Sequence, residues 1–119
     1  MGSEEQLGVP MIFTVYFPKD ESWVGAQGMD LLRQAVQMWE VKGRPAVEVT
    51  GHVDSSYPQE IRQPLSERRA QHVAHILRSM GIPDEFLHVS GRGDNEKAVP
   101  TADGVAEPRN RRVSIYIGH

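Results

Sequence analysis

The stretch at residues 46–70, AVEVTGHVDSSYPQEIRQPLSERRA, decides the fold. Residues 47–50 alternate valine with polar side chains, which is the pattern of a strand with one buried face. Asp54 follows shortly after this strand, so its carboxylate is expected at the carboxyl end, where ligands of mixed sheets commonly bind. Turn-forming residues come next, and Pro64 predicts the restart of the chain as a helix near residues 65–66.

The predicted helix carries an arginine at the edge of its apolar face. Residues at spacings of 3, 4 and 7 form that face: Val73, Ile76, Leu77 and Met80. Arg69 lies four residues before the first of them, and a buried arginine is costly unless it meets a carboxylate. Asp54 is the nearest candidate. Two interpretations stay open: a structural ion pair, or two separate charges that bind a zwitterion, with Arg69 on its carboxylate and Asp54 on its ammonium.

The rest of the chain completes an α+β pattern. We expect strands at 11–17, 86–90 and 111–117, and a first helix at about 22–41 with Trp39 in the core. The element order is then β-α-β-α-β-β. It predicts a two-layer sandwich with two helices packed on one face of a mixed four-stranded sheet. We expect residues 1–10 to be a flexible lead-in or tag remnant and residues 11–119 to be one domain.

Composition excludes several classes of function. The net charge of −3 argues against a nucleic-acid partner, and the absence of cysteine excludes disulfides and thiolate chemistry. The sequence has no apolar run near 20 residues, and we expect no leader peptide in residues 1–7. The five histidines are scattered, so we expect no metal site, no cofactor and no catalytic centre.

Five short blocks in a fixed order resemble a known family. They are GHVD at 51–54, LSERRA at 65–70, GIP at 81–83, GRGD at 91–94 and NRRV at 110–113. Together they resemble the OmpA C-terminal-like domain, the peptidoglycan-binding module of outer-membrane proteins, peptidoglycan-associated lipoproteins, flagellar stator proteins and secretion-system anchors. The resemblance covers roughly residues 11–117.

The resemblance implies a ligand and a set of binding residues. In this family the aspartate of GHxD and the arginine of LSxxRA, here Asp54 and Arg69, bind the free end of diaminopimelate in the peptidoglycan stem peptide. Arg111 is expected to add a contact at the rim, and Asn110 to order the backbone beside it. His52 is expected at the edge of the site, where the family's histidine is mostly structural.

Three departures from the family pattern affect this expectation. Val53 stands where threonine is usual, Arg62 stands where an asparagine is usual, and residues 100–109 are shorter than the usual segment. Arg62 is expected in the loop before the second helix. It would either face the ligand as a second cation or extend into solvent.

The resemblance implies a noncatalytic module in the periplasm of the bacterial cell envelope. The expected partner is peptidoglycan, and the parent protein is expected to be membrane-anchored outside this chain. The alternative is a domain that has lost wall binding and assembles with other proteins of a secretion or flagellar motor complex. A homodimer is left open, and an enzyme is the weakest hypothesis.

Overall fold

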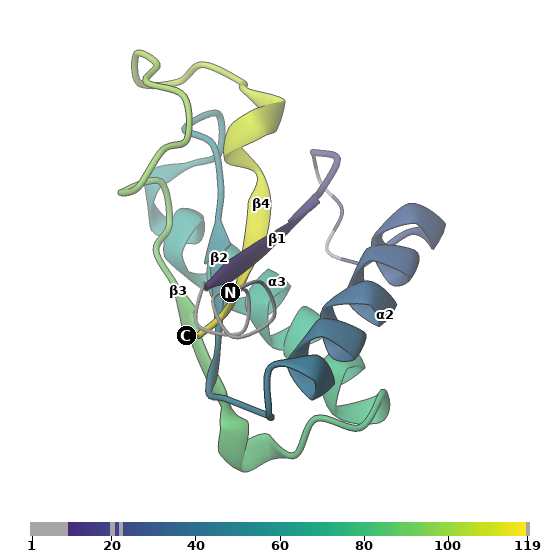
Figure 1. The fold of residues 1–119 in the computed structure, drawn as a ribbon. Helices are drawn as coiled ribbons and strands as arrows, with labels where there is room; N and C mark the ends of the chain where they lie inside the picture. The colour runs from purple at the N-terminus through teal and green to yellow at the C-terminus, as the bar shows by residue number, and fades with distance from the viewer. Residues whose placement is uncertain (1–9, 20, 22, 119) are drawn as a thin grey trace.

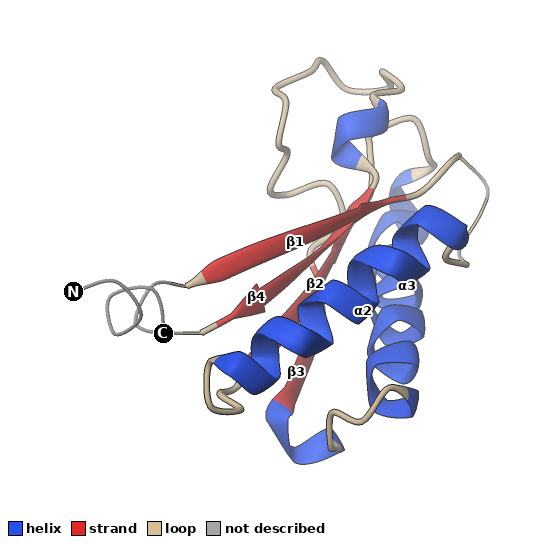
Figure 2. Cartoon of the chain, turned by 45° about the vertical axis from the view of Figure 1, so that its right-hand side comes forward, coloured by secondary structure: helices blue, strands red, loops and turns tan. Residues whose placement is uncertain are grey.

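The structure is a computed structural model that describes residues 10–19, 21 and 23–118. Its four strands form one mixed sheet in the order β1-β4-β2-β3, in which β4 is antiparallel to β1 and β2, and β2 is parallel to β3. The strands are β1 (Met11–Tyr16), β2 (Val47–His52), β3 (Leu87–Gly91) and β4 (Arg112–Ile117). Figure 2 shows both long helices, α2 (Ala26–Val41) and α3 (Gln59–Ser79), on the same side of this sheet. The predicted α+β sandwich is confirmed.

The core lies between the sheet and the two helices. Alternate side chains of β2 and β4 point toward the helices and are fully buried, because side chains of a strand alternate between its two faces. They are Val47, Val49, Val113, Ile115 and Ile117. Trp39 of α2 is 1% exposed, and its indole N–H donates to the Pro45 carbonyl at 2.8 Å. The prediction that Trp39 belongs to the core is confirmed.

Two glycines let α3 approach the sheet closely. A Cβ atom at Gly51 in β2 would overlap the carbonyl oxygen of Ser66, and one at Gly91 in β3 would overlap the Ser66 side chain. Ser66 is fully buried, and its Oγ accepts a hydrogen bond from the Gly93 N–H at 2.9 Å. The backbone of α3 therefore rests directly on β2, β3 and the loop that follows β3.

The starts that the sequence predicts for the two helices were both wrong. Helix α3 begins at Gln59 rather than near residue 65, and it contains Pro64 in its second turn. Proline there removes only one helical hydrogen bond, to the Glu60 carbonyl, and packing of the rest of α3 stabilises the helix despite that loss. The first long helix begins at Ala26, not near Ser22, which lies outside the described residues along with residues 1–9.

The chain before β3 also differs from the expectation. A single 3₁₀ turn, η1 (Asp84–Phe86), occupies the start of the predicted third strand, which then runs one residue further than expected. Phe86 contacts the edge of the Trp39 ring, with the ring centroids 5.5 Å apart. The turn thus packs an aromatic side chain against the edge of the hydrophobic core.

One end of the sheet gathers most of the loops. Figure 1 shows the carboxyl end of β2, the first turns of α3, the end of β1 and the long segment between β3 and β4 at the same end of the molecule. That segment contains η2 (Pro108–Asn110). Within the described ranges, neither long helix is apolar enough over a sufficient length to cross a bilayer.

Candidate functional site

All five predicted site residues lie at this loop-rich end, and four of them have charged side chains. Asp54 follows β2, Arg62 and Arg69 belong to α3, and Arg111 lies between η2 and β4. All four are buried, with exposed fractions of 0%, 7%, 0% and 9%, respectively. Burial of so many charged groups is costly unless each one has partners, so the partners of each residue decide what it does.

Asp54 is paired with Arg111, not with Arg69. The Arg111 Nη1 donates to Asp54 Oδ2 at 2.8 Å, and the Glu107 N–H donates to the same oxygen at 3.0 Å. Asp54 Oδ1 accepts from both the N–H and the hydroxyl of Ser56. Of the two interpretations left open, the structural ion pair between Asp54 and Arg69 is not formed, because the η2 segment brings a different arginine onto the carboxylate.

Burial alone would raise the pKa of the Asp54 carboxyl. Hydrogen bonds from Ser56, Arg111 and the Glu107 backbone outweigh that effect and hold the pKa below its ordinary value. Asp54 therefore stays ionised at neutral pH. Its four hydrogen bonds match the capacity of two carboxylate oxygens, so a new donor must replace an existing one.

Arg69 is fully buried, yet it has no carboxylate within 4 Å among the described residues. Its Nε and Nη2 donate to the carbonyl oxygens of Glu21 and Pro18, and Nη2 also donates to the Tyr57 hydroxyl at 3.1 Å. Its Nη1 has no hydrogen-bond partner among the described residues. A buried cationic N–H group without a partner is energetically unfavourable, and an anionic ligand would satisfy it.

Two aromatic rings flank the Arg69 guanidinium, and analysis of the sequence missed both. The carbon atom of the guanidinium lies 5.2 Å from the centroid of Phe17 and 5.6 Å from that of Tyr57. Cation–π contacts of this kind partly replace the water that the charge loses on burial. The sequence predicts Phe17 at the end of the first strand and Tyr57 in the turn before the second helix. No pattern at either position indicates a contact with Arg69, which lies 52 residues after Phe17 and 12 after Tyr57.

Arg62 does not extend into solvent, and it lies within the first turns of α3 rather than in a loop. Its Nε and Nη2 donate to the carbonyl oxygens of Tyr57 and Ser55 at 2.8 and 2.9 Å. Its Nη1 lies 3.1 Å from carboxylate oxygens of both Asp94 and Asp103. Arg62 thus joins the turn after Asp54 to the segment between β3 and β4.

His52 lies on the opposite face of the sheet from Arg69. Gly51 faces α3, so the neighbouring His52 faces away from the helices. It is buried, and its Nδ1 has no hydrogen-bond partner among the described residues. Burial, assisted by the positive charge of Arg112, lowers the pKa of His52 to about 4. The predicted grouping of His52 with the other site residues is not supported by this geometry.

Asn110 orders the backbone beside it, as predicted. Its side-chain amide donates to the Val99 carbonyl at 2.9 Å, and its side-chain oxygen accepts from the Val99 N–H at 2.8 Å. This pair of bonds anchors the segment between β3 and β4 to the residue that precedes Arg111. The asparagine of NRRV therefore positions the arginine that pairs with Asp54.

A shallow hollow of about 390 Å³ opens beside Arg111. Its lining is mostly apolar, with two arginines: Tyr16, Phe17, Pro18, Pro108, Arg109 and Arg111. Phe17 contacts the Arg69 guanidinium, so the hollow lies next to both halves of the predicted site. In the part of the chain that the structure describes, no group of three or more potential metal ligands is present.

Comparison with known proteins places these features in context. A model of the OmpA family matches residues 16–111. An outer membrane protein of Gluconacetobacter diazotrophicus is 32% identical over 111 residues, which is 88% of this chain and 29% of that protein. This chain therefore spans less than a third of that curated relative.

Two solved structures are similar over most of both chains. The peptidoglycan-associated lipoprotein of Burkholderia pseudomallei aligns with a TM-score of 0.77 and 25% identity, over 87% of this chain and 88% of that one. The cell wall anchor of the type VI secretion system of Pseudomonas aeruginosa aligns with a TM-score of 0.75 and 26% identity, over 92% and 81%. The fold derived above is thus shared with envelope proteins.

Proposed function

From the premise that this chain belongs to the OmpA family, we propose that it is a noncatalytic domain that binds peptidoglycan and anchors a larger protein to the cell wall. The match to the family model confirms the resemblance inferred from the five motifs. The relatives named above are envelope proteins, in agreement with the expected location of this domain in the periplasm.

The partner set of Arg69 supports this function most directly. The side chain is fully buried, has no carboxylate partner among the described residues, and leaves Nη1 without an acceptor. Two aromatic rings hold the guanidinium in place, so it is preorganised to bind a ligand. The free Nη1 can donate charge-assisted hydrogen bonds to a carboxylate, and diaminopimelate carries a carboxylate beside an ammonium.

Asp54 would receive the ammonium of the same ligand. Its four hydrogen bonds require that one donor leaves when the ammonium binds. The Ser56 hydroxyl and the Arg111 guanidinium belong to side chains, and side chains rotate more easily than the backbone moves. In this proposal Arg111 releases Asp54 and turns toward a negative group at the rim of the ligand.

A pull-down on purified sacculi tests the two charges. Arg69→Met and Asp54→Asn should each reduce capture by more than tenfold, because loss of one partner of a desolvated contact costs about 2–5 kcal/mol. Arg78→Met is the matched control, since Arg78 belongs to the same helix but pairs with the exposed Asp84. Folding of each variant is checked by the fluorescence of the buried Trp39. Capture of folded Arg69→Met at the wild-type level would contradict the proposal.

The chemistry of the stem peptide provides a second test. Diaminopimelate offers an amine and a carboxylate on one carbon, whereas the lysine side chain ends in an amine alone. We therefore expect at least tenfold weaker capture by lysine-type walls than by diaminopimelate-type walls, which corresponds to about 1.4 kcal/mol. Equal capture by both walls would mean that Arg69 does not bind the terminal carboxylate.

One observation favours a second function. Asp54 is already saturated by partners within the chain, and Arg62 connects the surrounding loops. A site closed in this way suits a domain that has lost wall binding and serves in the assembly of a secretion or motor complex. Failure of the wild-type chain to bind any sacculus, with the fold intact, would favour this alternative.

A further inference from the structure

The outer edge of β1 is a free edge of the sheet. This strand lies at one end of the strand order, and in the described part of the chain only β4 pairs with it. Phe17 continues their register, and its N–H donates to the Arg111 carbonyl at 2.9 Å. Because hydrogen-bonded pairs alternate with non-bonded pairs in an antiparallel ladder, every second residue of β1 directs its N–H and carbonyl groups to the free edge. These residues are Ile12, Thr14 and Tyr16.

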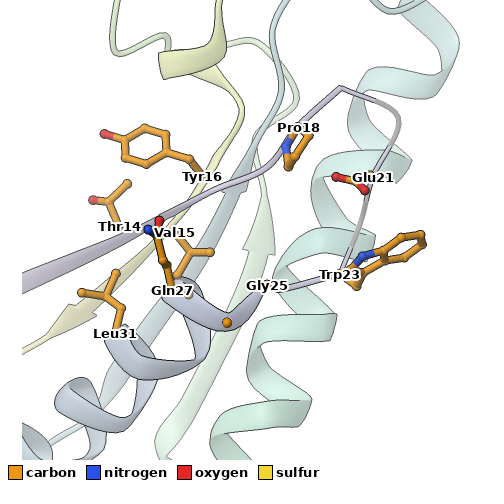
Figure 3. Close-up of a pocket in the computed structure, with 11 residues that line it drawn as sticks. Thr14, Val15, Tyr16, Pro18, Glu21, Trp23, Gly25, Gln27 and Leu31 are labelled. Carbon is orange, nitrogen blue, oxygen red and sulfur yellow. The ribbon is translucent and has the colours of Figure 1, made fainter.

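A groove of about 660 Å³ runs beside this edge, between β1 and the start of α2. It is lined by Thr14, Val15 and Tyr16, which belong to both faces of β1, so the groove follows the backbone of the strand. Figure 3 shows the Thr14 and Tyr16 side chains pointing away from α2. The opposite wall has small residues: Gly25, Ala26 and Gly28. A paired strand lies about 4.8 Å from its neighbour, and the groove leaves room for its backbone.

The segment that contains β1 is symmetric about its centre. Residues 10–18, PMIFTVYFP, carry no charge and begin and end with proline. Proline has no N–H group, so the row of outward donors ends at both prolines. Thr14 lies four residues from each of them. A second copy that pairs antiparallel with Thr14 opposite Thr14 therefore places Pro10 opposite Pro18 at both ends.

This register also covers the exposed apolar side chains of β1. Ile12 is 63% exposed and Tyr16 is 58% exposed. In the pairing centred on Thr14, Ile12 of one copy lies opposite Tyr16 of the other, on the sheet face away from the helices. Pairs of an aromatic with a β-branched residue and pairs of threonines stabilise antiparallel strands. Without charges in the segment, two copies meet with no repulsion between like charges.

We propose that the free edge of β1 is a self-association surface, at which two copies of this chain pair their β1 strands antiparallel about Thr14 and join their sheets into one. Each hydrogen-bonded pair exchanges two hydrogen bonds, so all outward groups of the three edge residues are used. The contact is isologous, and it closes because each copy has used this edge. Neither Asp54 nor Arg69 takes part, so the inference goes beyond the proposed function.

Sedimentation equilibrium of the whole chain tests the association. The interface is small, so wild type should convert from monomer to dimer as its concentration rises toward about 1 mM. Ile12→Lys should weaken the dimer by about tenfold, because a lysine on an edge strand opposes pairing. Val41→Lys is the matched control, since Val41 of α2 is 62% exposed, and should leave the dimer unchanged. A wild type that stays monomeric, or a dimer that Ile12→Lys does not weaken, would overturn the proposal.

Cross-linking tests the register. Opposed residues of a hydrogen-bonded pair have Cα atoms about 5.5 Å apart, within the range of a disulfide, and the chain has no cysteine of its own. Thr14→Cys should therefore form a covalent dimer on oxidation, and Val41→Cys should not. A mixture of Ile12→Cys and Tyr16→Cys should cross-link one variant to the other in preference to itself. Equal cross-linking of Thr14→Cys and Val41→Cys, or no preference in the mixture, would overturn this pairing.

Amide hydrogen exchange identifies what covers the edge. The amides of Phe13 and Val15 bond β4 and should be protected at every concentration. Those of Ile12, Thr14 and Tyr16 should gain protection only as the dimer forms. Protection of these three at a concentration where the chain is monomeric would mean that another segment covers the edge, and it would overturn a second copy as the occupant.

Discussion

Arg62 and Arg69 lie two turns apart on α3, and both are buried, yet their surroundings are opposite. Arg62 has carboxylates at 3.1 Å and a hydrogen-bond partner for each of its three nitrogens. Arg69 has two aromatic rings, no carboxylate among the described residues, and one nitrogen without a partner. A satisfied arginine holds a structure together, whereas an unsatisfied one is available to a ligand.

Tyr57 connects the two arginines. Its carbonyl oxygen accepts from Arg62 and its hydroxyl oxygen accepts from Arg69. Arg62 therefore fixes the backbone of the turn whose side chain orients Arg69. The difference between the two residues indicates that Arg62, which stands where the family pattern has asparagine, has a structural role beside the candidate site.

The same substitution at both positions tests this comparison most strongly. Arg62→Met should lower the free energy of unfolding by about 3–5 kcal/mol. It removes the partner of the partly buried Asp94 carboxylate and of the Tyr57 and Ser55 carbonyl oxygens. Arg69→Met should change it by less than about 1 kcal/mol, since removal of an unpaired buried charge offsets the lost hydrogen bonds. Urea denaturation measures both, with Arg33→Met as the exposed control. Equal losses of unfolding free energy for Arg62→Met and Arg69→Met would contradict the assignment of a structural role to Arg62 alone.

A pH titration of stability tests His52, which lies on the sheet face opposite the two arginines. His52 is neutral in the folded state because its pKa is about 4, whereas the unfolded chain takes up the proton near pH 6.5. Its stabilising contribution is thus complete above pH 6.5 and is lost as the pH falls from 6.5 toward 4, by up to about 3 kcal/mol. Arg112 and Arg92 oppose protonation and Glu96 favours it.

The measurement is the free energy of unfolding at pH 7.5 and 4.5 for wild type and His52→Gln. The variant should lose less stability between the two pH values. His72, whose pKa is also lowered, is present in both proteins, so the difference belongs to His52. The low pKa of Asp54 makes its own contribution disappear only at still lower pH. An identical pH dependence in both proteins would contradict the assigned environment of His52.

The smallest expected effect separates the two acidic partners of Arg62. The side chain of Asp94 is 17% exposed and that of Asp103 is 78% exposed, although both lie 3.1 Å from the same nitrogen. Asp94→Asn should cost about 1–2 kcal/mol of stability, and Asp103→Asn less than about 0.5 kcal/mol, because solvent screens an exposed ion pair. Each variant is the control for the other in thermal unfolding. A larger loss for Asp103→Asn would contradict the assignment of Asp94 as the main acidic partner of Arg62.

The sequence predicted the layers of the fold well, for a physical reason. The alternation along 47–50 and the helical spacing from Val73 to Met80 each report which face of an element is buried. The position of Pro64 was misleading, since a proline early in a helix is compatible with the fold when the remaining turns pack tightly.

The site was only partly predictable. The motifs identified Asp54, Arg69 and Arg111, and periodicity placed Arg69 beside the core. No local pattern could reveal that Arg111 reaches Asp54 across 57 residues, or that Arg62 contacts Asp94 across 32. Such pairings depend on how the segment between β3 and β4 folds back, and tertiary contacts alone determine that path.

The position of β4 has a consequence for how the chain acquires its structure. The last strand of the described chain, β4, lies between β1 and β2. It pairs residues that are far apart in the sequence, since Met11 of β1 is opposite Ile117 of β4. A ribosome that synthesises the chain from its amino terminus produces β1, β2 and β3 before the strand that joins β1 to β2 is available. Contacts of such high sequence separation slow folding, because the entropy of closing a long loop is lost before the stabilising contacts between the strands form. The domain is therefore expected to remain unfolded until β4 has been synthesised and can pair with both β1 and β2.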